Sequence, residues 1–251
     1  MRLHRFFINN NAEKAELSSN QKLGASKISI LNPEIIHQLS KVFRYKIGQK
    51  VILFNGTGLD YVYEISKLSK DSAEFIFVEK KANKNLRANF TVAFSIIKKQ
   101  NNELIIQKCT ELGVSDFQPL ISERTEKKNF EIDRVTKIAI EAVEQSGQDT
   151  IPTINNPMHL SDFLEQLSII NADTFAFDMS GEIFDLEKIK KNQITTNQNI
   201  TNQTTTNQDI SNQTKQEQST TIKPIIILIG PEGGWSSAEL DIFGKKNVKI
   251  F

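Results

Sequence analysis

The sequence predicts an α/β protein in two parts, a β-rich front third followed by strands that alternate with helices. Three observations lead to this prediction. Short apolar runs separated by turn residues occupy the chain up to residue 78, and amphipathic helical patterns alternate with buried strands after residue 90. With 251 residues, 38% of them hydrophobic, the chain is also long enough to bury a core.

In the front part, strands are expected at residues 5–8, 50–54, 60–65 and 73–78. Asn55 and Gly56 begin a turn of the kind that closes a tight hairpin. Residues 33–43 predict one short helix, because their apolar side chains fall on a single face: Ile35, Ile36, Leu39, Val42 and Phe43. We therefore expect a small β-rich domain at residues 1–80.

A polar segment at residues 80–85 suits an exposed linker, and the pattern changes after it. Strands are expected at residues 91–97, 114–121, 174–177 and 225–229, and helices at 102–112, 132–143 and 162–167. Gly113 stands where a left-handed residue ends a helix. Because strands and helices alternate, we expect a parallel α/β sheet in a second domain at residues 81–251.

A low-complexity segment at about residues 191–222 interrupts this domain. Asn, Gln and Thr fill 22 of the 30 positions from 192 to 221, and Asn-Gln recurs every five residues, a period of neither helix nor strand. Such a composition cannot form a core, so we interpret it as a disordered insertion. An interaction or aggregation-prone tract is the alternative.

Composition excludes several classes of protein. The single cysteine, Cys109, permits neither an internal disulfide nor a thiol zinc site. The longest apolar run, residues 225–229, is too short to cross a bilayer, and the first residues lack the apolar stretch of a secretory signal. We expect a cytoplasmic protein that does not enter a membrane.

The near-balanced charge, 31 Lys and Arg against 30 Asp and Glu, conceals a gradient. Residues 1–50 carry nine Lys and Arg against three acids, whereas residues 148–251 carry eight Lys against thirteen acids. A basic face commonly binds a phosphate backbone, because neutralised phosphates release their counterions. The alternative is an ordinary solvated surface.

The sharpest local motif is a glycine-rich turn after the apolar strand at 225–229. It reads GPEGGW at residues 230–235, and Ser236 with Glu239 forms a plausible capping box that starts a helix. Backbone N–H groups and the positive end of the helix dipole then converge on the turn, at the strand end where parallel sheets bind ligands. The turn is neither a phosphate-binding loop of the GxxxxGK type nor a dinucleotide fingerprint. The alternative is an ordinary turn whose glycines serve only its geometry.

Several segments, in this order along the chain, resemble the bacterial 16S rRNA uridine-N3 methyltransferase family of the SPOUT class. The front segments are similar to the family's PUA-like domain and the later ones to its methyltransferase domain: RLHRFF at 2–7, HQLSKVFRYKIGQ at 37–49, IQKCTELGV at 106–114, PLISERT at 119–125, EQSG at 144–147 and GPEGGW at 230–235. The resemblance spans the chain from first residue to last, apart from the insertion.

The resemblance implies a PUA-like β-barrel that holds rRNA and an α/β domain with a trefoil knot that binds S-adenosylmethionine and forms a homodimer. The implied reaction is methylation of uracil N3 in 16S rRNA of the small ribosomal subunit. Methyl transfer from a sulfonium donor needs mainly an aligned nucleophile, so positioning of the substrate should dominate catalysis. A preorganised cation should also stabilise the negative charge that develops on the uracil ring.

The resemblance also implies site residues. Gly230, Glu232, Gly233 and Gly234 are expected to line the cofactor pocket, with Leu228 and Phe177 as apolar walls. Arg124 is the candidate for contacting RNA or stabilising the transition state, with an ion pair to Glu123 or Glu126 as its alternative role.

Two further groups of residues in this second domain could have either a structural or a functional role. Lys108 and Glu111, three residues apart, are expected to form a structural pair. Gln145, Ser146 and Gly147 either face the nucleotide or end a helix.

In the front domain, Arg2, Arg5, Lys41 and Arg44 are the expected phosphate contacts. The rings of Phe43 and Tyr45 flank Arg44 and could stack unpaired bases, although core packing is favoured for Phe43. His4, His37 and His159 lack metal-ligand spacing, and Cys109 is expected to pack. No metal is expected.

The sequence ends at residues 247–251, whereas the family continues into a Leu-Gly turn, an Arg-Thr-Glu-Thr-like segment and a last helix. We therefore expect a C-terminally truncated copy, with the strongest candidate for the catalytic arginine in the absent segment. The competing hypothesis is a non-catalytic RNA-binding remnant that has lost donor binding; a SPOUT relative with another RNA target is a third.

Overall fold

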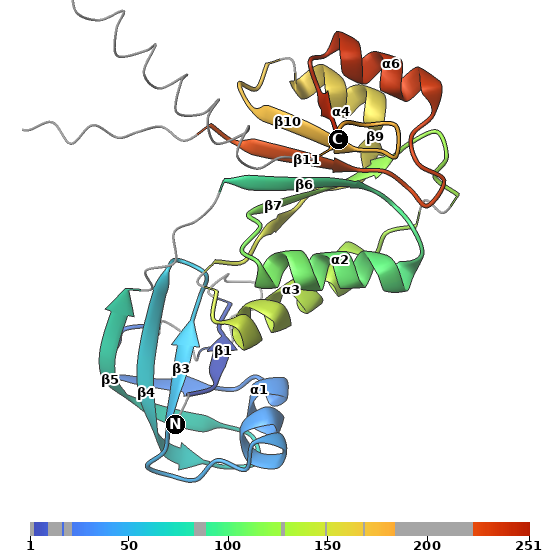
Figure 1. The fold of residues 1–251 in the computed structure, drawn as a ribbon. Coiled ribbons are helices and arrows are strands. Elements are labelled where there is room, and N and C mark those ends of the chain that lie inside the picture. Colours follow the sequence, from blue (N-terminus) through green and yellow to red (C-terminus); the bar gives the residue numbers. More distant parts are fainter. Residues whose placement is uncertain are drawn as a thin grey trace, which may run out of the picture.

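A computed structural model describes residues 3–9, 17, 22–82, 89–126, 129–148, 150–167, 169–183 and 223–251. It places a curled sheet from the front of the chain beside a parallel sheet covered by helices (Figure 1). The predicted α/β class with a β-rich front part is confirmed. The segment interpreted as an insertion, 191–222, lies outside the described residues.

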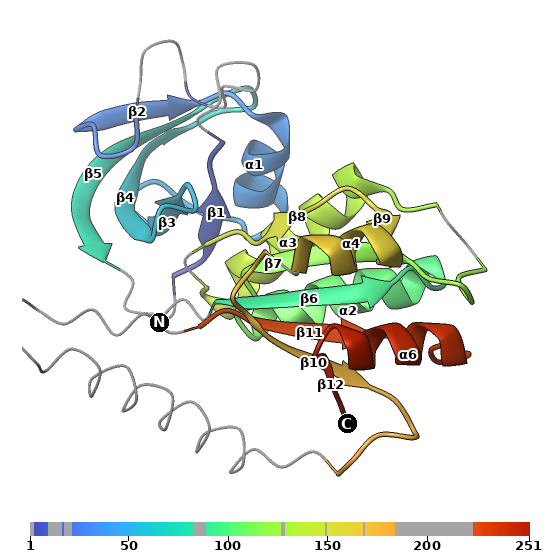
Figure 2. The same ribbon diagram turned by 90° about the horizontal axis from the view of Figure 1, so that it is seen from above.

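The front sheet has, among the described residues, five strands in the order β1-β3-β4-β5-β2. They span Arg5–Phe7 (β1), Lys27–Ile30 (β2), Lys50–Phe54 (β3), Leu59–Leu68 (β4) and Ala73–Ala82 (β5). β1 runs parallel to β3 and the other pairs are antiparallel. The β4–β5 register shifts twice, and such bulges bend a sheet, which fits its curl in Figure 2.

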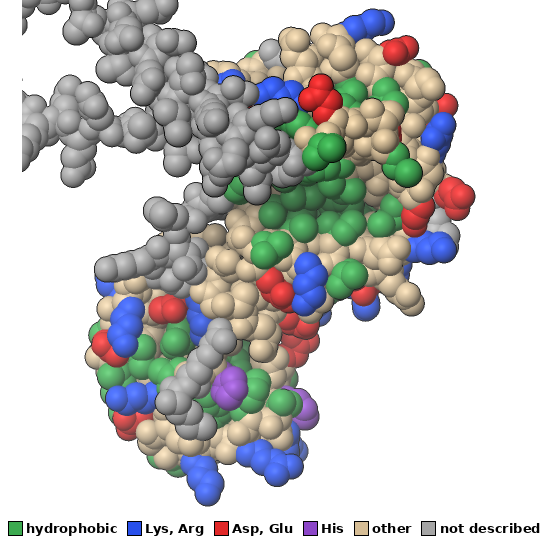
Figure 3. Space-filling view, viewed as in Figure 1, with side chains coloured by type: hydrophobic (Ala, Val, Ile, Leu, Met, Phe, Trp, Pro, Cys, Tyr) green, Lys and Arg blue, Asp and Glu red, His purple; other side chains and the backbone are tan. Residues whose placement is uncertain are grey.

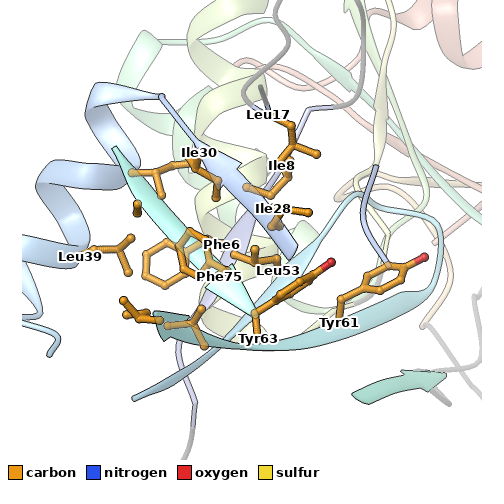
Figure 4. Packing of buried hydrophobic residues seen from close by; sticks show 14 residues of the cluster. Phe6, Ile8, Leu17, Ile28, Ile30, Leu39, Leu53, Tyr61, Tyr63 and Phe75 are labelled. Carbon is orange, nitrogen blue, oxygen red and sulfur yellow. The ribbon is translucent and has the colours of Figure 1, made fainter. Parts of the chain in front are cut away.

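Side chains from all five strands meet in one hydrophobic core. Figure 4 shows Phe6, Leu53, Tyr63 and Phe75 pointing into it, with Leu39 closing one side. Tyr63 is fully buried, and its hydroxyl accepts from the Gly24 N–H and donates to the Ala25 carbonyl. The alternating burial of these strands follows from the two-residue period of an extended chain.

Two predictions for the front part are corrected. The single helix expected at 33–43 is a short α-helix, α1 (Pro33–His37), followed by a π-helical turn, η2 (Gln38–Val42), because the Phe43 N–H bonds to the Gln38 carbonyl at 2.8 Å. This rotation leaves Val42 58% exposed, off the buried face. The expected linker starts too early, because β5 continues to Ala82.

The second sheet is parallel throughout, in the order β12-β10-β11-β6-β7-β8 within the described chain, and β9 also pairs with β7. Its strands span Phe90–Ser95 (β6), Asp116–Ile121 (β7), Thr153–Ile154 (β8), Met158–His159 (β9), Asp173–Phe177 (β10), Ile225–Ile229 (β11) and Lys249–Ile250 (β12). The predicted parallel sheet is confirmed, and the strand expected at 225–229 matches β11.

Helices cover both faces of this sheet. Figure 1 shows α2 (Lys99–Glu111) and α3 (Ile132–Ser146) on the face toward the front sheet, and α4 (Leu160–Leu167) and α6 (Ser237–Lys245) on the other. Two hydrophobic clusters correspond to these faces, one around Phe94 and Phe117, the other around Leu228 and Phe243. β7 and β8 follow β6 along the chain and lie on one side of it, whereas β10 and β11 come later and lie on the other side. The strand order therefore reverses between β6 and β11.

A buried arginine joins the two parts. Arg5, 7% exposed, donates through Nη2 to Asp60 at 2.7 Å and through Nη1 to the carbonyls of Val143 and Gln148 at 3.2 and 2.6 Å. Its guanidinium also lies 4.3 Å from the centroid of the Phe54 ring. One residue of the front sheet therefore binds the carboxyl end of α3, where the helix dipole favours a cation.

None of the helices in the described residues has the length and apolar character needed to cross a membrane.

Candidate active site

A cleft of about 500 Å³ opens at the carboxyl ends of β6, β7 and β11, where the strand order reverses. Its lining comes from the segments that follow these three strands: Ile96, Ile97, Lys98, Glu123, Arg124, Thr125, Glu126, Glu232 and Gly233. Both the volume and the place are typical of ligand sites in parallel sheets. We refer to it as the switch-point cleft.

The glycine-rich turn between β11 and α6 forms one wall of the cleft. A tryptophan anchors this turn: Trp235 is 3% exposed, and its Nε1 donates to the Phe177 carbonyl at 3.2 Å. A Cβ on Gly230 would lie 3.1 Å from the Trp235 ring, so a larger residue here would have to displace the ring by a few tenths of an ångström. Gly234 has φ +69° and donates to the Pro231 carbonyl, which turns the chain sharply into the helix.

The capping box predicted at the start of α6 is present. Ser236 Oγ accepts from the Glu239 N–H at 3.2 Å, and Glu239 Oε2 accepts from the Ser236 N–H at 2.8 Å. The other carboxylate oxygen, Oε1, accepts from the Glu123 N–H at 2.8 Å. Glu239, 7% exposed, therefore ties the glycine turn to the segment after β7. Sequence reasoning identified the cap but not this second bond, whose partner lies 116 residues away.

Arg124 lies at the mouth of the cleft. Its Nη1 donates to the Gly233 carbonyl at 2.6 Å, and a Cβ on Gly233 would lie 3.5 Å from the Arg124 side chain. The alternative ion pairs with Glu123 or Glu126 are not formed among the described residues. The structure therefore brings the predicted arginine and the predicted glycine turn together.

A chain of hydroxyl groups supports the floor of the cleft. Ser95 donates to Ser122 at 2.9 Å, and Ser122 is 2.8 Å from Thr125, all three buried. Asn102 bonds both the N–H and the carbonyl of Ile97, each at 3.0 Å, and so fixes the loop before α2. Sequence reasoning missed these residues, because isolated Ser, Thr and Asn carry no distinctive spacing.

Asp178, which follows β10, is a further acid near the turn. The side-chain hydroxyl and the backbone N–H of Ser180 bond its carboxylate and lower the pKa of Asp178, and the positive charge of Arg124 lowers it further. A Cβ on Gly234 would lie 3.5 Å from Asp178 Oδ2. The turn is therefore bordered by a carboxylate held in its charged form.

The two predicted apolar walls lie in different surroundings. Leu228 is fully buried in the core under α4 and α6, and it does not line the cleft. Phe177 does not line the cleft either; its side chain is 37% exposed, and its backbone carbonyl accepts from Trp235 Nε1.

The other predicted groups of this domain lie away from the cleft. Lys108 and Glu111 form an ion pair at 2.9 Å, the structural role expected for their spacing. Gly147 ends α3 in the left-handed conformation with φ +86°, and Ser146 bonds back to the Ala142 carbonyl. Gln145 lines a different pocket, between α3 and the front sheet.

The predicted phosphate contacts of the front part include both exposed and buried residues. Lys41 and Arg44 are exposed, and Arg44 has φ +54°, a conformation that non-glycine residues rarely adopt. Arg5 is a correction: it is buried and its guanidinium bonds Asp60 and α3, so it is not available to phosphate. Arg2 lies outside the described residues.

The remaining predicted residues have local partners. His4 Nδ1 is 2.8 Å from the Tyr45 hydroxyl, and the His4 ring lies 4.1 Å from Phe43, centroid to centroid. Phe43 packs on the front core, as favoured. Cys109 is part-buried, and burial raises the pKa of its thiol. The described residues contain no group of three or more His, Cys, Asp or Glu that could hold a metal ion.

Comparisons with solved structures show which fold this is. A ribosomal RNA small subunit methyltransferase E from Neisseria gonorrhoeae bound to S-adenosyl methionine superposes with a TM-score of 0.73 at 22% identity, covering 99% of this chain and 88% of that one. A putative methyltransferase from Legionella pneumophila in complex with S-adenosylmethionine gives 0.71 at 19% identity, covering 100% and 88%. The chain shares their fold.

Sequence comparisons agree. Proteins named ribosomal RNA small subunit methyltransferase E from Rickettsia conorii and Bacillus subtilis are 27% and 26% identical to this chain. The matches cover 99% and 95% of this chain, and 86% and 84% of those proteins. The family described as an RNA methyltransferase PUA domain matches residues 31–78, and the one described as an RNA methyltransferase domain matches 84–251. Since the second match alone covers more than half of the sequence, the chain belongs to the RNA methyltransferase family.

Proposed function

We propose that this protein transfers a methyl group from S-adenosylmethionine to N3 of a uracil in the 16S rRNA of the small ribosomal subunit. The observation that carries the proposal is the switch-point cleft, in which the glycine turn holds Arg124 at the mouth of a ligand-sized space. The family supplies the reaction class, and the relatives' names supply the rRNA substrate.

The residues around the cleft fit the donor. Gly230, Gly233 and Gly234 expose backbone without side chains beside the amino end of α6, where N–H groups favour a carboxylate such as that of the methionine portion. Glu123, Glu126 and Glu232 place carboxylates along the cleft, which suits a cation. S-adenosylmethionine, when bound, would supply an electrophilic methyl group, and the bond from that methyl to the sulfonium sulfur breaks to leave a neutral thioether. Phe177 is the better placed of the two predicted walls, because Leu228 is fully buried.

Arg124 is proposed to stabilise the transition state. As the N3 proton leaves to solvent water, negative charge spreads over the two carbonyl oxygens of uracil. A preorganised guanidinium stabilises that charge without reorganising. The bond from Nη1 to the Gly233 carbonyl orients the side chain and leaves its other N–H groups for the substrate. The Arg124 side chain is therefore oriented before the RNA binds.

The front part, residues 1–80, is proposed to hold the RNA, and residues 81–251, with an insertion at about 191–222, to carry the transfer. Lys41, Arg44 and Lys46 are exposed near Val42 and Ile47, which are 58% and 64% exposed. Exposed Lys and Arg side chains are the usual contacts to a phosphate backbone, which supports an RNA-binding role for this surface. We also propose a cytoplasmic location, because the proposed substrate is the rRNA of the small ribosomal subunit.

We also propose a homodimer that forms through the sheet face beside α2. Alternate residues of β11, Ile225, Ile227 and Ile229, are only half-buried there, and Phe177 continues the surface. Figure 3 shows a continuous hydrophobic area where β11 and β6 run above α2. An apolar area of this kind is typical of an interface. Ile227→Asp should convert the dimer to a monomer in sedimentation equilibrium, and a wild-type monomer would refute the assignment.

The reaction is tested with purified protein, methyl-labelled S-adenosylmethionine and unmethylated small ribosomal subunits. We expect label at uridine, identified as N3-methyluridine by nucleoside mass spectrometry. Arg124→Met should lower kcat about 100-fold or more. The matched control, Lys245→Met, removes an exposed cation on α6 and should leave kcat unchanged.

Three outcomes discriminate the alternatives. A folded protein that transfers no methyl group refutes the enzyme assignment. Calorimetry that then finds RNA affinity without donor affinity supports the RNA-binding remnant. Label on a different nucleoside indicates another RNA target.

A further inference from the structure

A second pocket lies at the junction of the two parts and is not used by the proposed reaction. It has about 380 Å³ and is lined by Leu3, His4, Arg5, Phe6, Gln38, Phe43, Gln107, Glu111, Glu141, Ala142, Glu144 and Gln145. We call it the junction pocket. The stretch of α2 from Lys99, beside the switch-point cleft, to Gln107 spans about 12 Å at 1.5 Å per residue. The two spaces are therefore separate but within reach of one RNA strand.

We propose that the junction pocket receives one unpaired nucleobase that carries an exocyclic amino group, from the same RNA that is methylated. The proposal rests on the proposed function for the identity of the RNA. It adds a second recognition point, with a stated base chemistry, that lies away from the reacting uracil.

A fixed ring platform forms one side of the pocket. His4 is exposed, and its ring lies 4.1 Å from Phe43 at an interplanar angle of 32°. Its Nδ1 is 2.8 Å from the Tyr45 hydroxyl, and Tyr45 meets His4 edge to face. The imidazole is therefore oriented before any ligand binds, and aromatic side chains held in this way are the usual platforms for unpaired RNA bases.

The polar lining selects a base rather than a phosphate. Of the three glutamates that line the pocket, Glu111 pairs with Lys108 and Glu144 accepts from the Phe7 N–H, so Glu141 brings the exposed carboxylate. Gln107 and Gln145 bring amides. Carboxylates repel phosphate, but they accept from the amino group of cytosine, and side-chain amides pair with adenine. Glu141 and Gln145 are both exposed and lie one helical turn apart on α3, so they present an acceptor and an amide on the same face. Uracil has no amino group to offer them.

Cations stand next to the platform in the sequence. Lys41 and Arg44 are exposed on either side of Phe43, and Arg44, whose backbone is left-handed, stands between the part-buried Phe43 and Tyr45. A strand whose phosphates bind these cations can turn a base onto His4. A basic peptide would also suit carboxylates and rings, but the same cations repel it, so RNA is favoured.

Fluorescence anisotropy with the full chain and labelled eight-nucleotide homopolymers tests the proposal without donor or methyl transfer. We expect oligo(A) or oligo(C) to bind at least fivefold tighter than oligo(U) at 150 mM salt. His4→Ala should weaken that oligomer about tenfold and leave oligo(U) nearly unchanged. His4→Phe, which keeps a ring, should retain most of the affinity, and Glu141→Gln should reduce the preference over oligo(U). Lys70→Ala, an exposed cation on the β4–β5 turn, is the control.

Equal binding of all three oligomers by the wild type, or loss in His4→Phe as large as in His4→Ala, overturns the proposal. The proposal is also overturned if an octalysine peptide binds more tightly than the RNA oligomers and if Glu141→Gln weakens the binding of that peptide. Methylation of small subunits is measured in parallel, where His4→Ala should raise KM for the subunit and spare kcat. A wild type that methylates subunits but shows no base preference refutes this inference alone, whereas one that neither methylates nor binds RNA refutes the proposed function.

Discussion

Replacing Glu239 with Gln tests how the cleft is held together. The Glu239 carboxylate accepts two backbone hydrogen bonds of 2.8 Å, from Glu123 and from Ser236, at a site that is 7% exposed. A glutamine of the same shape has one oxygen and one amino group. The amino group cannot accept, so one buried N–H of the two loops loses its partner.

The cost follows from the two bonds. A hydrogen bond to a charged group contributes about 1.5–3 kcal/mol, and a buried N–H left unpaired costs about 1–3 kcal/mol. Because these figures partly describe the same loss, we expect the free energy of unfolding to fall by about 2–4 kcal/mol. At about 3 °C per kcal/mol for a chain of this size, Tm falls by roughly 6–12 °C.

Thermal unfolding followed by circular dichroism measures this change, with Asp241→Asn as the matched control. Asp241 lies on the same helix and is exposed, so its substitution should change Tm by about 2 °C or less. Because Glu239 joins the glycine turn to the loop that carries Arg124, Glu239→Gln should also weaken donor binding about tenfold in calorimetry. A Tm equal to that of the control would mean that the carboxylate does not tie the two loops.

Four further substitutions extend the test to other sites. Gly230→Ala brings a Cβ to 3.1 Å from Trp235 and should lower unfolding free energy by about 1–3 kcal/mol in urea, whereas Gly244→Ala, on α6 with nothing within 4 Å, should raise it by about 0.5–1 kcal/mol. Arg5→Met removes the buried cation between the two parts and should cost about 3–5 kcal/mol; a loss below about 1 kcal/mol contradicts that role. Burial raises the pKa of Tyr63 above its ordinary 10.0. The folding stability that the buried, neutral Tyr63 contributes is therefore fully present below its ordinary pKa and is lost as the pH rises through the higher folded-state pKa. Urea unfolding at pH 8 and 11 should show a smaller alkaline loss in Tyr63→Phe than in the wild type.

The parts of the fold with strong local patterns could be predicted from the sequence. Residues 225–229 are five consecutive apolar residues, a run typical of a strand in a parallel sheet, and they form β11 in the middle of the sheet. The glycine turn and the Ser236–Glu239 capping box follow it within a few residues, so their geometry is also local. The amphipathic period of α3 is equally explicit.

Features that depend on distant partners were not predictable. β2 is only four residues long and is defined by its pairing with β5, more than forty residues later. Arg5 stands in a basic stretch that indicates a phosphate contact, but Asp60 and the end of α3 bind it in the fold. The helix expected at 33–43 loses its regular period because one hydrogen bond in η2 spans five residues instead of four.

The joint made by Arg5 limits how freely the two halves of this protein can be recombined. Its hydrogen bonds end on backbone carbonyls near the end of α3 and on a carboxylate of the front sheet. A chimaera that takes its front half from a relative must therefore supply a guanidinium at the same point. Otherwise those carbonyl groups lose their hydrogen-bond donor at the junction. For the same reason the native chain should melt in a single calorimetric transition rather than as two modules.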